Sequence, residues 1–274
     1  MINESEEEVA KSVVTELYRE GFIQTLYNTE SEKHQGEGWT LKSGIWSPWF
    51  LNLRPLGDSP QLANYISSAM NRMIRGNVPG LTKMVGIEMA GVPLVASIGT
   101  VTGYGCEFIP YAYTRPFPGG EKPRTPEEAV EILSRMGAPN YKYGQKELVE
   151  GSLREGDVLC ITDDMVTNFG SKLIARHILE HEIQRRGIYL ENVKIDDVAV
   201  VLDREQGGAE EAKKYGMRLH SLVKFKTQGL EYLEEAMHPG EFVLIADYQQ
   251  NPERYQNRDM QKEVLEMAAK VRGN

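Results

Sequence analysis

The sequence predicts an α/β protein with a central, mostly parallel sheet and helices on both faces. Short runs with mostly apolar residues, at 83–88, 158–162 and 197–202, are typical of strands buried on both faces. Helical stretches separate these runs, at 60–75, from about 92, at 171–186 and at 208–216. Strands that alternate with helices form parallel sheets. Further strands are expected at 106–113 and 218–224.

The two ends of the chain depart from this alternation. Residues 5–28 have the apolar spacing of an amphipathic helix, and residues 36–54 read as an aromatic-rich hairpin. Near the other end, 240–246 read as an extra strand and 258–271 as a charged helix. We therefore expect an N-terminal part at 1–55, a core at 56–224 and a C-terminal extension at 225–274.

A long segment, 115–147, interrupts the core. It opens with the breaker-rich run RPFPGGEKPR, and a capping box then begins at Thr125 and is completed by Glu128. A short helix over 126–136 should follow and end at Gly137. Loops of this length are usually functional or mobile.

Composition excludes several classes of protein. The chain has 274 residues, a net charge of -9 and a pI near 5.2, which argue against a nucleic-acid partner because phosphate binding needs a cationic surface. The acidic start does not resemble a targeting peptide, and no apolar run approaches the ~20 residues of a membrane span. Cys106 and Cys160, each expected in a strand, read as buried thiols of a cytoplasmic protein.

The strongest chemical signal is the segment VLCITDDMVTNFGS at 158–171. An apolar strand ends in Asp163 and Asp164, and a small polar loop then leads into a helix. Ligands of open α/β sheets bind beyond the carboxyl ends of the strands, and loop amides at a helix N-terminus bind anions. Two carboxylates beside such a loop suit a ligand that carries both a sugar diol and a phosphate.

This segment resembles the phosphoribosyl pyrophosphate (PRPP) motif of type I phosphoribosyltransferases. The resemblance implies that Asp163 and Asp164 hold the ribose hydroxyls. It also implies that the 5′-phosphate is held by Thr167, Asn168, Gly170 and Ser171. Phe169 stands where the family usually has glycine, and it would be costly there if the position needs a positive φ. An ordinary strand-to-helix turn with solvated acids is the alternative.

Two further segments are similar to those of orotate phosphoribosyltransferases. LKSGIWSPWFLNLR at 41–54 matches a hairpin whose lysine contacts PRPP and whose aromatic pair lies along the base, which implies these roles for Lys42, Trp49 and Phe50. Alternatively these aromatics are core residues. GIEMAGVPL at 86–94 looks like the pyrophosphate loop, lined by Glu88, Met89, Ala90 and Gly91, although generic glycine turns are common.

The interrupting segment resembles the family's mobile catalytic loop at both ends. Arg115 matches the arginine that opens that loop, and YKYGQKELVEG at 141–151 matches its end. The implied catalytic cations are Arg115, Lys142 and Lys146, with Lys122 and Arg124 as further candidates. Pro116 and Tyr141 depart from the pattern, and roughly residues 116–139 look inserted, so a charged lid without a catalytic role is the alternative.

Arg204 favours a resemblance to the orotate enzymes over the purine enzymes. VVLDREQGG at 200–208 resembles the segment whose arginine pairs with the orotate carboxylate, and a guanidinium fork binds a carboxylate with two hydrogen bonds. An arginine that caps a helix is the alternative.

Together these matches imply the type I phosphoribosyltransferase fold, with residues 1–55 as its hood. The implied reaction joins orotate and PRPP to give orotidine 5′-monophosphate and pyrophosphate, with Mg²⁺, in a homodimer. A phosphoribosyltransferase for another base, such as a purine, and a non-catalytic PRPP- or nucleotide-binding relative both stay open. His177 and His181 have the spacing of metal ligands but read as the polar face of a helix, so no protein metal site is expected.

Overall fold

The computed structural model describes residues 4–41, 44–103, 105–136 and 147–273. It divides into two compact units. Residues 63–222 form the core unit. Residues 3–62 and 223–274 together form the second, which we call the flanking unit. The C-terminal extension therefore folds with the N-terminal part of the chain.

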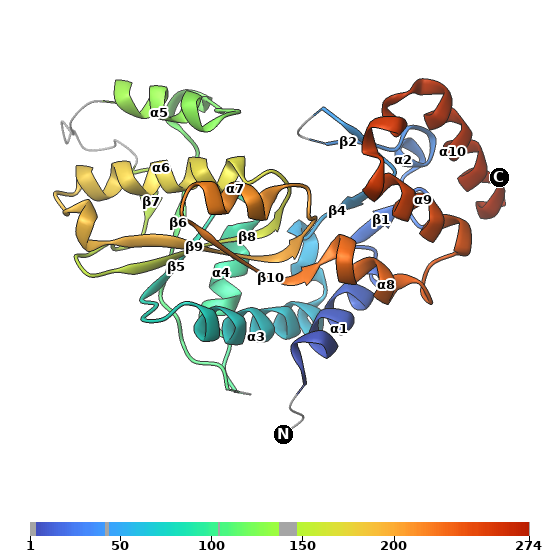
Figure 1. Cartoon of the computed structure of the whole chain (residues 1–274). Helices are drawn as coiled ribbons and strands as arrows, with labels where there is room; N and C mark the ends of the chain where they lie inside the picture. The colour runs from blue at the N-terminus through green and yellow to red at the C-terminus, as the bar shows by residue number, and fades with distance from the viewer. Residues whose placement is uncertain (1–3, 42–43, 104, 137–146, 274) are drawn as a thin grey trace. The chain divides into compact units, whose positions relative to one another are not determined.

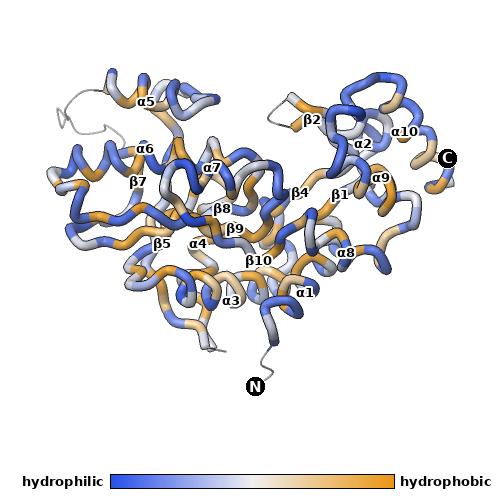
Figure 2. The backbone as a smooth tube through the Cα atoms, viewed as in Figure 1, coloured by the Kyte–Doolittle hydropathy of each residue, from blue (hydrophilic) through white to orange (hydrophobic). Residues whose placement is uncertain are grey.

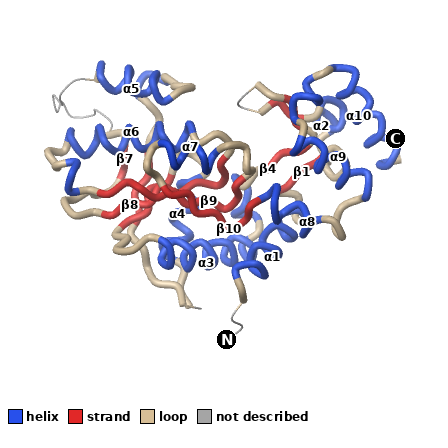
Figure 3. Tube along the Cα trace, in the orientation of Figure 1, coloured by secondary structure: helices blue, strands red, loops and turns tan. Residues whose placement is uncertain are grey.

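A six-stranded sheet in the order β10-β9-β8-β5-β6-β7 organises the core unit. Figure 3 shows the strands in red. Its strands are β5 (Lys83–Gly86), β6 (Tyr111–Thr114), β7 (Val149–Glu150), β8 (Val158–Val166), β9 (Lys194–Asp203) and β10 (Arg218–Lys224). β5 pairs in parallel with β6 and β8, β8 pairs in parallel with β9, and β7 is antiparallel to β6. The predicted mostly parallel sheet is thus confirmed.

Helices cover both faces of this sheet. α3 (Pro60–Asn77) and α4 (Gly91–Thr100) lie on one face, and α6 (Gly170–Arg185) and α7 (Gly208–Lys214) lie on the other (Figure 1). α6 alternates hydrophilic and hydrophobic residues along its length (Figure 2). Its apolar side chains join a core cluster with β8 and β9, which buries the central strands on both faces.

The interrupting segment contains the helix that its capping box predicts. α5 spans Pro126–Arg135, and the Thr125 hydroxyl accepts a 3.2 Å hydrogen bond from the Glu128 amide. α5 packs against α6 through Ala129, Ile132 and Leu133, all of which are buried. This part of the segment is therefore anchored to the core unit. The predicted helix end at Gly137 lies outside the described residues.

Several predicted boundaries are wrong in instructive ways. The N-terminal helix α1 covers only Glu6–Arg19, because Gly21 turns the chain with a φ of 76° into strand β1 (Ile23–Thr25). Strand β6 begins at Tyr111 rather than at 106, so Cys106 lies before it. β8 continues to Val166, which places both Asp163 and Asp164 inside the strand.

The predicted hairpin is split between two pairings. Helix α2 (Glu32–Glu37) precedes β2 (Trp39–Thr40), which pairs with β3 (Trp46–Ser47). β4 (Trp49–Leu51) pairs instead with β1. Only the centre of the predicted 36–54 hairpin therefore forms as one.

The predicted strand at 240–246 is wrong, because these residues lie in helix α9 (Pro239–Gln250). His238 caps this helix, Pro239 follows as its first residue, and the Glu241 carboxylate accepts from the His238 amide, which completes a capping box. Leu244, Ile245 and Tyr248 are buried on one helical face. The apolar run has the same composition as a strand, but its caps select a helix.

The remaining C-terminal elements complete the flanking unit. They are a π-helical turn at Phe225–Gly229, α8 (Leu230–Leu233), a 3₁₀ turn at Pro252–Gln256 and α10 (Arg258–Arg272), the last of which confirms the predicted charged helix. The Tyr248 hydroxyl donates to the Trp46 carbonyl at 3.1 Å, and Gln256 Oε1 accepts from the Trp46 amide at 2.8 Å. Among the described residues, no helix combines the length and hydropathy that crossing a bilayer requires.

Candidate functional site

Three parts of the core unit meet at the carboxyl edge of the sheet. Asp163 and Asp164 lie in the last part of β8, just beyond its pairing with the neighbouring strand β5, and the turn 87–91 follows β5. The Ile87 amide donates to the Thr162 carbonyl at 3.1 Å, which ties this turn to β8. The loop 167–170 then leads from β8 into α6.

The turn after β5 is held against β8 by two glycines. A Cβ on Gly91 would lie 2.7 Å from the Thr162 carbonyl oxygen, and one on Gly86 would lie 2.6 Å from the Gly91 carbonyl oxygen. Neither distance leaves room for a side chain, so both residues must be glycine for the turn to pack this closely. The sequence therefore fixes the position of the predicted pyrophosphate loop through its glycines.

The side chains of this turn present a mixed surface. Met89 is largely exposed, Ala90 is half-buried, and the Glu88 amide donates to the Thr114 hydroxyl at 3.1 Å. Partial burial raises the pKa of Glu88, and the nearby charge of Lys122 opposes that rise. Lys122 belongs to the interrupting segment, so the described part of that segment carries a cation within electrostatic range of the turn.

The two acids of β8 are not equivalent. Asp163 is buried, and its Oδ1 accepts from the Asp164 amide at 3.0 Å. Its Oδ2 accepts from Lys172 Nζ at 2.8 Å in an ion pair. Asp164 is half-buried, and its Oδ1 accepts from the Met165 amide at 2.7 Å. Burial first, and then the charge of Asp163, raise the pKa of Asp164 to about 7.

Lys172 is the site residue that the sequence analysis missed. It sits in the first turn of α6, where its side chain is only 3% exposed. A lysine in an otherwise amphipathic helix normally reads as solvated. The signal available in the sequence was its distance of nine residues from Asp163, which is too general to identify a partner.

The loop 167–170 contains a residue with a positive φ, at the position where glycine is usual. Phe169 has a φ of 63° and serves as the N-cap of α6, so the phenylalanine takes the left-handed conformation expected to favour glycine. Its ring is 1% exposed and belongs to the hydrophobic core cluster with Val166 and Leu173. Burial of the ring offsets the strained backbone.

The other predicted phosphate ligands lie around this loop. Thr167 and Gly170 are half-buried, and Asn168 and Ser171 are exposed. Asn168 Oδ1 accepts from the Gly170 amide at 3.4 Å. The Phe169 carbonyl accepts from the Lys172 and Leu173 amides, which begins the helix at the loop.

Arg204 follows β9, next to the loop. Its amide donates to the Val166 carbonyl at 3.1 Å, and its side chain is 1% exposed. Gly208, at the start of α7, lies so near that a Cβ there would be 3.0 Å from the Thr167 carbonyl oxygen. The N-cap of α7 is Gly207 rather than Arg204. The segment after β9 is thus packed directly against the loop after β8.

Arg115 lies at the base of the interrupting segment. Its amide donates to the Leu148 carbonyl at 2.8 Å, and its guanidinium pairs with Glu150 of β7. The antiparallel pairing of β6 with β7 therefore closes the two ends of the segment together. The predicted cations Lys142 and Lys146 lie outside the described residues.

The predicted base-stacking pair belongs to the flanking unit, and its two rings lie on opposite sides of β4 because side chains alternate along a strand. Trp49 is fully buried and stacks on Phe225, with ring centroids 4.2 Å apart. Trp49 is therefore a core residue and does not present its ring to a base. Phe50 is half-buried and stacks on Trp39 at 6.4 Å. Lys42 lies outside the described residues.

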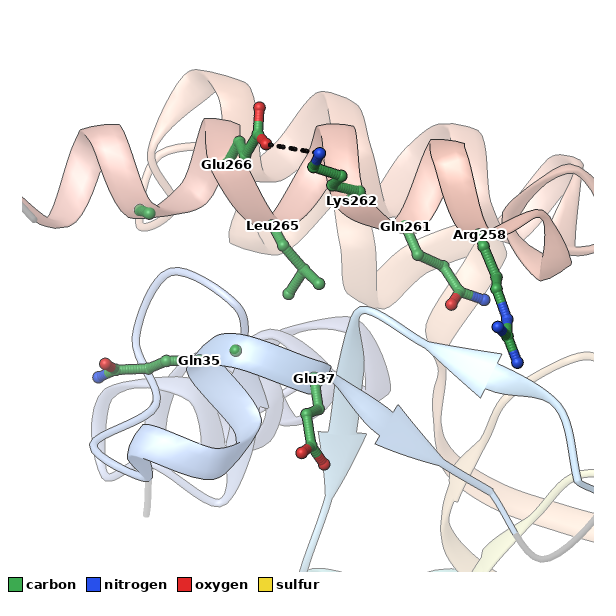
Figure 4. A pocket seen from close by; sticks show the side chains of 9 residues that line it. Gln35, Glu37, Arg258, Gln261, Lys262, Leu265 and Glu266 are labelled. Atoms are coloured by element: carbon green, nitrogen blue, oxygen red, sulfur yellow. Dashed lines mark ion pairs between the residues drawn. The ribbon is translucent and has the colours of Figure 1, made fainter.

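The flanking unit also contains a shallow groove between α2 and α10 (Figure 4). Lys262 and Glu266 on its α10 wall form an ion pair at 3.9 Å. No residue that lines it was predicted as a site residue. Across the part of the chain that the structure describes, no group of three histidine, cysteine or carboxylate side chains is arranged to hold a metal ion.

Comparisons with known proteins agree on one fold. No protein-family model matches the chain. It is 29% identical over 187 residues to uridine 5′-monophosphate synthase of Caenorhabditis elegans, and this alignment covers 68% of this chain and 31% of that protein. It is 26% identical over 184 residues to orotate phosphoribosyltransferase of Thermoplasma volcanium, covering 67% of this chain and 86% of that one.

Solved structures extend the likeness. UMP synthase of Leishmania donovani superposes with a TM-score of 0.63 at 18% identity, over 88% of this chain and 42% of that one. Orotate phosphoribosyltransferase of Aeropyrum pernix gives 0.53 at 18% identity, over 82% and 98%. The predicted type I phosphoribosyltransferase fold is therefore confirmed. The chain spans about a third of the length of the UMP synthases that it matches in sequence.

Proposed function

We propose that this chain is a phosphoribosyltransferase that joins orotate to PRPP, giving orotidine 5′-monophosphate and pyrophosphate. The observation that carries the proposal is the meeting of an acid pair, a glycine-packed turn and a helix-starting loop at one edge of the sheet. Such an edge can bind the hydroxyls of a sugar at the acid pair and an anionic group at the turn and at the loop on either side. Sequence relatives named orotate phosphoribosyltransferase and UMP synthase support the choice of reaction.

Each group of residues takes the role that its position supports. Asp163 and Asp164 serve the ribose hydroxyls. The 5′-phosphate binds at the loop formed by Thr167, Asn168, Gly170 and Ser171. The pyrophosphate binds at the turn formed by Glu88, Met89, Ala90 and Gly91. This arrangement places the reacting C1′ carbon between two anion sites, so that catalysis consists mainly of positioning.

Two residues are proposed to recognise orotate. Arg204 supplies the guanidinium for the orotate carboxylate, and Phe50 supplies an aromatic face for the ring. Trp49 would act only by supporting β4, since its own ring is buried against Phe225. Arg115, Lys142 and Lys146, together with Lys42, would balance the charge of the departing pyrophosphate.

Magnesium fits this site as a companion of the substrate. The described carboxylates do not form a set of three that would hold a metal by themselves. Mg²⁺ keeps several waters and binds readily to diphosphate oxygens. It would therefore enter with PRPP and draw charge from the leaving diphosphate, while Asp163 and Asp164 orient the ribose. A homodimer in the cytoplasm completes the proposal.

A pyrophosphate-release assay tests this function. Protein, PRPP and Mg²⁺ are mixed with orotate and, in parallel, with adenine, hypoxanthine or uracil. Release that depends on orotate supports the proposal, and release with a purine alone would replace it with the purine alternative. PRPP binding by calorimetry without release from any base would support the non-catalytic relative, an outcome made plausible by Phe169 and Pro116.

Arg204 variants add a control on the base. Arg204→Ala should cripple an orotate enzyme and spare one that binds no carboxylate. Because the side chain is buried, Arg204→Lys is the matched variant, since it keeps a cation but loses the two-pronged fork. We expect it to raise the KM for orotate by at least tenfold and to change the KM for PRPP little, with circular dichroism confirming the fold.

A further inference from the structure

Lys172 is a buried cation with a complete set of partners. Its ammonium donates to Asp163 Oδ2 at 2.8 Å, to the Met165 carbonyl at 2.5 Å and to the Ser171 hydroxyl at 3.2 Å. An ammonium has three donors, so all of them are used. These partners lie on both sides of the loop 167–170, and Lys172 therefore links the end of β8 to the start of α6.

Helix stability does not explain this placement. A cation in the first turn of a helix faces the positive end of the helix dipole, which is unfavourable. Burial of an ammonium adds a desolvation cost that only good partners repay. Residues that break local rules in this way are often found at functional sites, and Lys172 lies beside the acid pair.

The pairing makes the two neighbouring acids unequal. Both oxygens of Asp163 are engaged, one by Lys172 and the other by the Asp164 amide, and its side chain is 11% exposed. Asp164 is more exposed, and one of its oxygens accepts only from the neighbouring Met165 amide. Asp164 is thus the acid that retains acceptor capacity for a ligand.

We propose that Lys172 is the positioning residue of the ribose site: it holds Asp163 as a structural carboxylate and leaves Asp164 to accept hydrogen bonds from the ribose hydroxyls. This inference rests on the proposed function and refines it: direct contact with the ribose hydroxyls, assigned there to Asp163 and Asp164 together, is assigned here to Asp164, and Asp163 acts through Lys172 and Asp164. By linking Met165 to Ser171, the ammonium also fixes the width of the phosphate loop.

The electrostatic consequence is specific. On its own strand, Asp164 faces the charge of Asp163, which raises its pKa, and from α6 it faces Lys172, which lowers it. The adjacent strand β9 offers Val201 in register, an apolar residue, and the turn after β5 carries Glu88. Lys172 is therefore the cation whose loss should make Asp164 harder to ionise.

The test follows PRPP binding by calorimetry, with Mg²⁺, from pH 5.5 to 9. In Lys172→Met, the acid limb of the profile of affinity against pH should move to higher pH by at least about one pH unit. The reason is that an adjacent opposite charge lowers the pKa of an acid by about 1–3 units, and the variant removes that charge. With the pKa of Asp164 near 7, such a rise reduces the ionised fraction at pH 7 from about one half to about one tenth. Affinity at pH 7 should then fall about fivefold or more.

Two variants separate charge from packing. Lys172→Arg keeps the cation and should leave the acid limb within about half a unit of the wild type. The double variant Asp163→Asn with Lys172→Met removes both opposing charges, so its acid limb should return to the wild-type position or lie below it. Lys213→Met, at an exposed position of α7, serves as the surface control and should change nothing.

A ligand-free measurement keeps the test decisive if a variant binds poorly. The side-chain carboxyl carbons of ¹³C-aspartate-labelled protein are titrated by NMR, with Asp164→Asn identifying the signal. An unmoved Asp164 titration in Lys172→Met, or a double variant that shifts as far as the single one, would overturn the role of Lys172. Failure of the wild-type protein to bind PRPP would instead overturn the proposed function.

Discussion

Phe169 gives the sharpest test of the loop, because its backbone and its side chain make opposite contributions to stability. Its φ of 63° costs an L-residue about 1–2 kcal/mol relative to glycine. Its ring is 1% exposed in the core, and removing a buried phenylalanine ring costs about 3–5 kcal/mol. Phe169→Ala loses the ring and keeps the strain, whereas Phe169→Gly loses the ring and relieves the strain.

Glycine should therefore be the milder substitution at this position. Its greater freedom in the unfolded chain returns roughly 0.4–1 kcal/mol, so Phe169→Gly should be more stable than Phe169→Ala by about 0.5–1 kcal/mol. Phe169→Ala should lie about 3–5 kcal/mol below the wild type, and Phe169→Gly about 2–4 kcal/mol below it. Urea unfolding, followed by circular dichroism and by amide exchange, measures the free energy of unfolding of both variants and so ranks their stability.

Phe117 is the matched control for this comparison. It is buried in the same core cluster but has a φ of -58°, which any residue adopts without strain. There alanine should be the milder substitution, by the usual margin of about 0.5–1 kcal/mol. If Phe169→Gly proves no more stable than Phe169→Ala, the left-handed conformation does not strain the loop and the explanation of its departure from glycine is wrong.

Three other predictions concern the same site and its surroundings. Gly91→Ala should cost about 1–3 kcal/mol and weaken PRPP binding, because the new Cβ would meet the Thr162 carbonyl oxygen at 2.7 Å; Gly76→Ala, with open space around it, should be neutral or stabilising in thermal melts. Trp49→Ala should lower the free energy of unfolding by about 3–5 kcal/mol, whereas Phe50→Ala should cost about 1 kcal/mol and raise the KM for orotate severalfold; equal effects on stability would contradict the assignment of Trp49 alone to the core. Asp164→Asn should become increasingly stabilising relative to the wild type as the pH rises from about 4 to about 7, because in that window the folded protein keeps the proton that the unfolded chain has lost; melts that show no such trend would contradict the raised pKa of Asp164.

The sequence predicts the core sheet well because its signals are local and agree with one another. Continuous apolar runs mark the strands, and the capping box at Thr125 marks α5. The glycines of 86–91 and the acids of 163–164 are likewise local signals, and the structure places them at the neighbouring strands β5 and β8. Each of these features is decided within a few residues, so the sequence alone is sufficient.

The flanking unit was harder to predict because its pairings join distant segments. β4 pairs with β1 rather than continuing the hairpin, and the C-terminal extension packs with N-terminal elements. The buried Glu241 carboxylate accepts hydrogen bonds from the hydroxyls of Tyr18 at 2.9 Å and Thr25 at 2.5 Å, more than 200 residues away in sequence. No local pattern identifies such partners, and the apolar run of α9 reads equally well as a strand until its caps are considered.

Two local rules are broken side by side in the loop between β8 and α6. Phe169 occupies a left-handed position, and Lys172 is buried in the first turn of a helix where a cation is unfavourable. Different contacts offset the two costs. Packing of the Phe169 ring in the hydrophobic core offsets its strained backbone, and hydrogen bonds to Asp163 and two other oxygen acceptors offset the burial of the Lys172 ammonium. The ammonium engages the inner acid, Asp163, and the outer acid, Asp164, retains acceptor capacity. The titration of Asp164 in the Lys172 variants therefore decides whether this buried ion pair serves the proposed ribose site or only the packing of the loop.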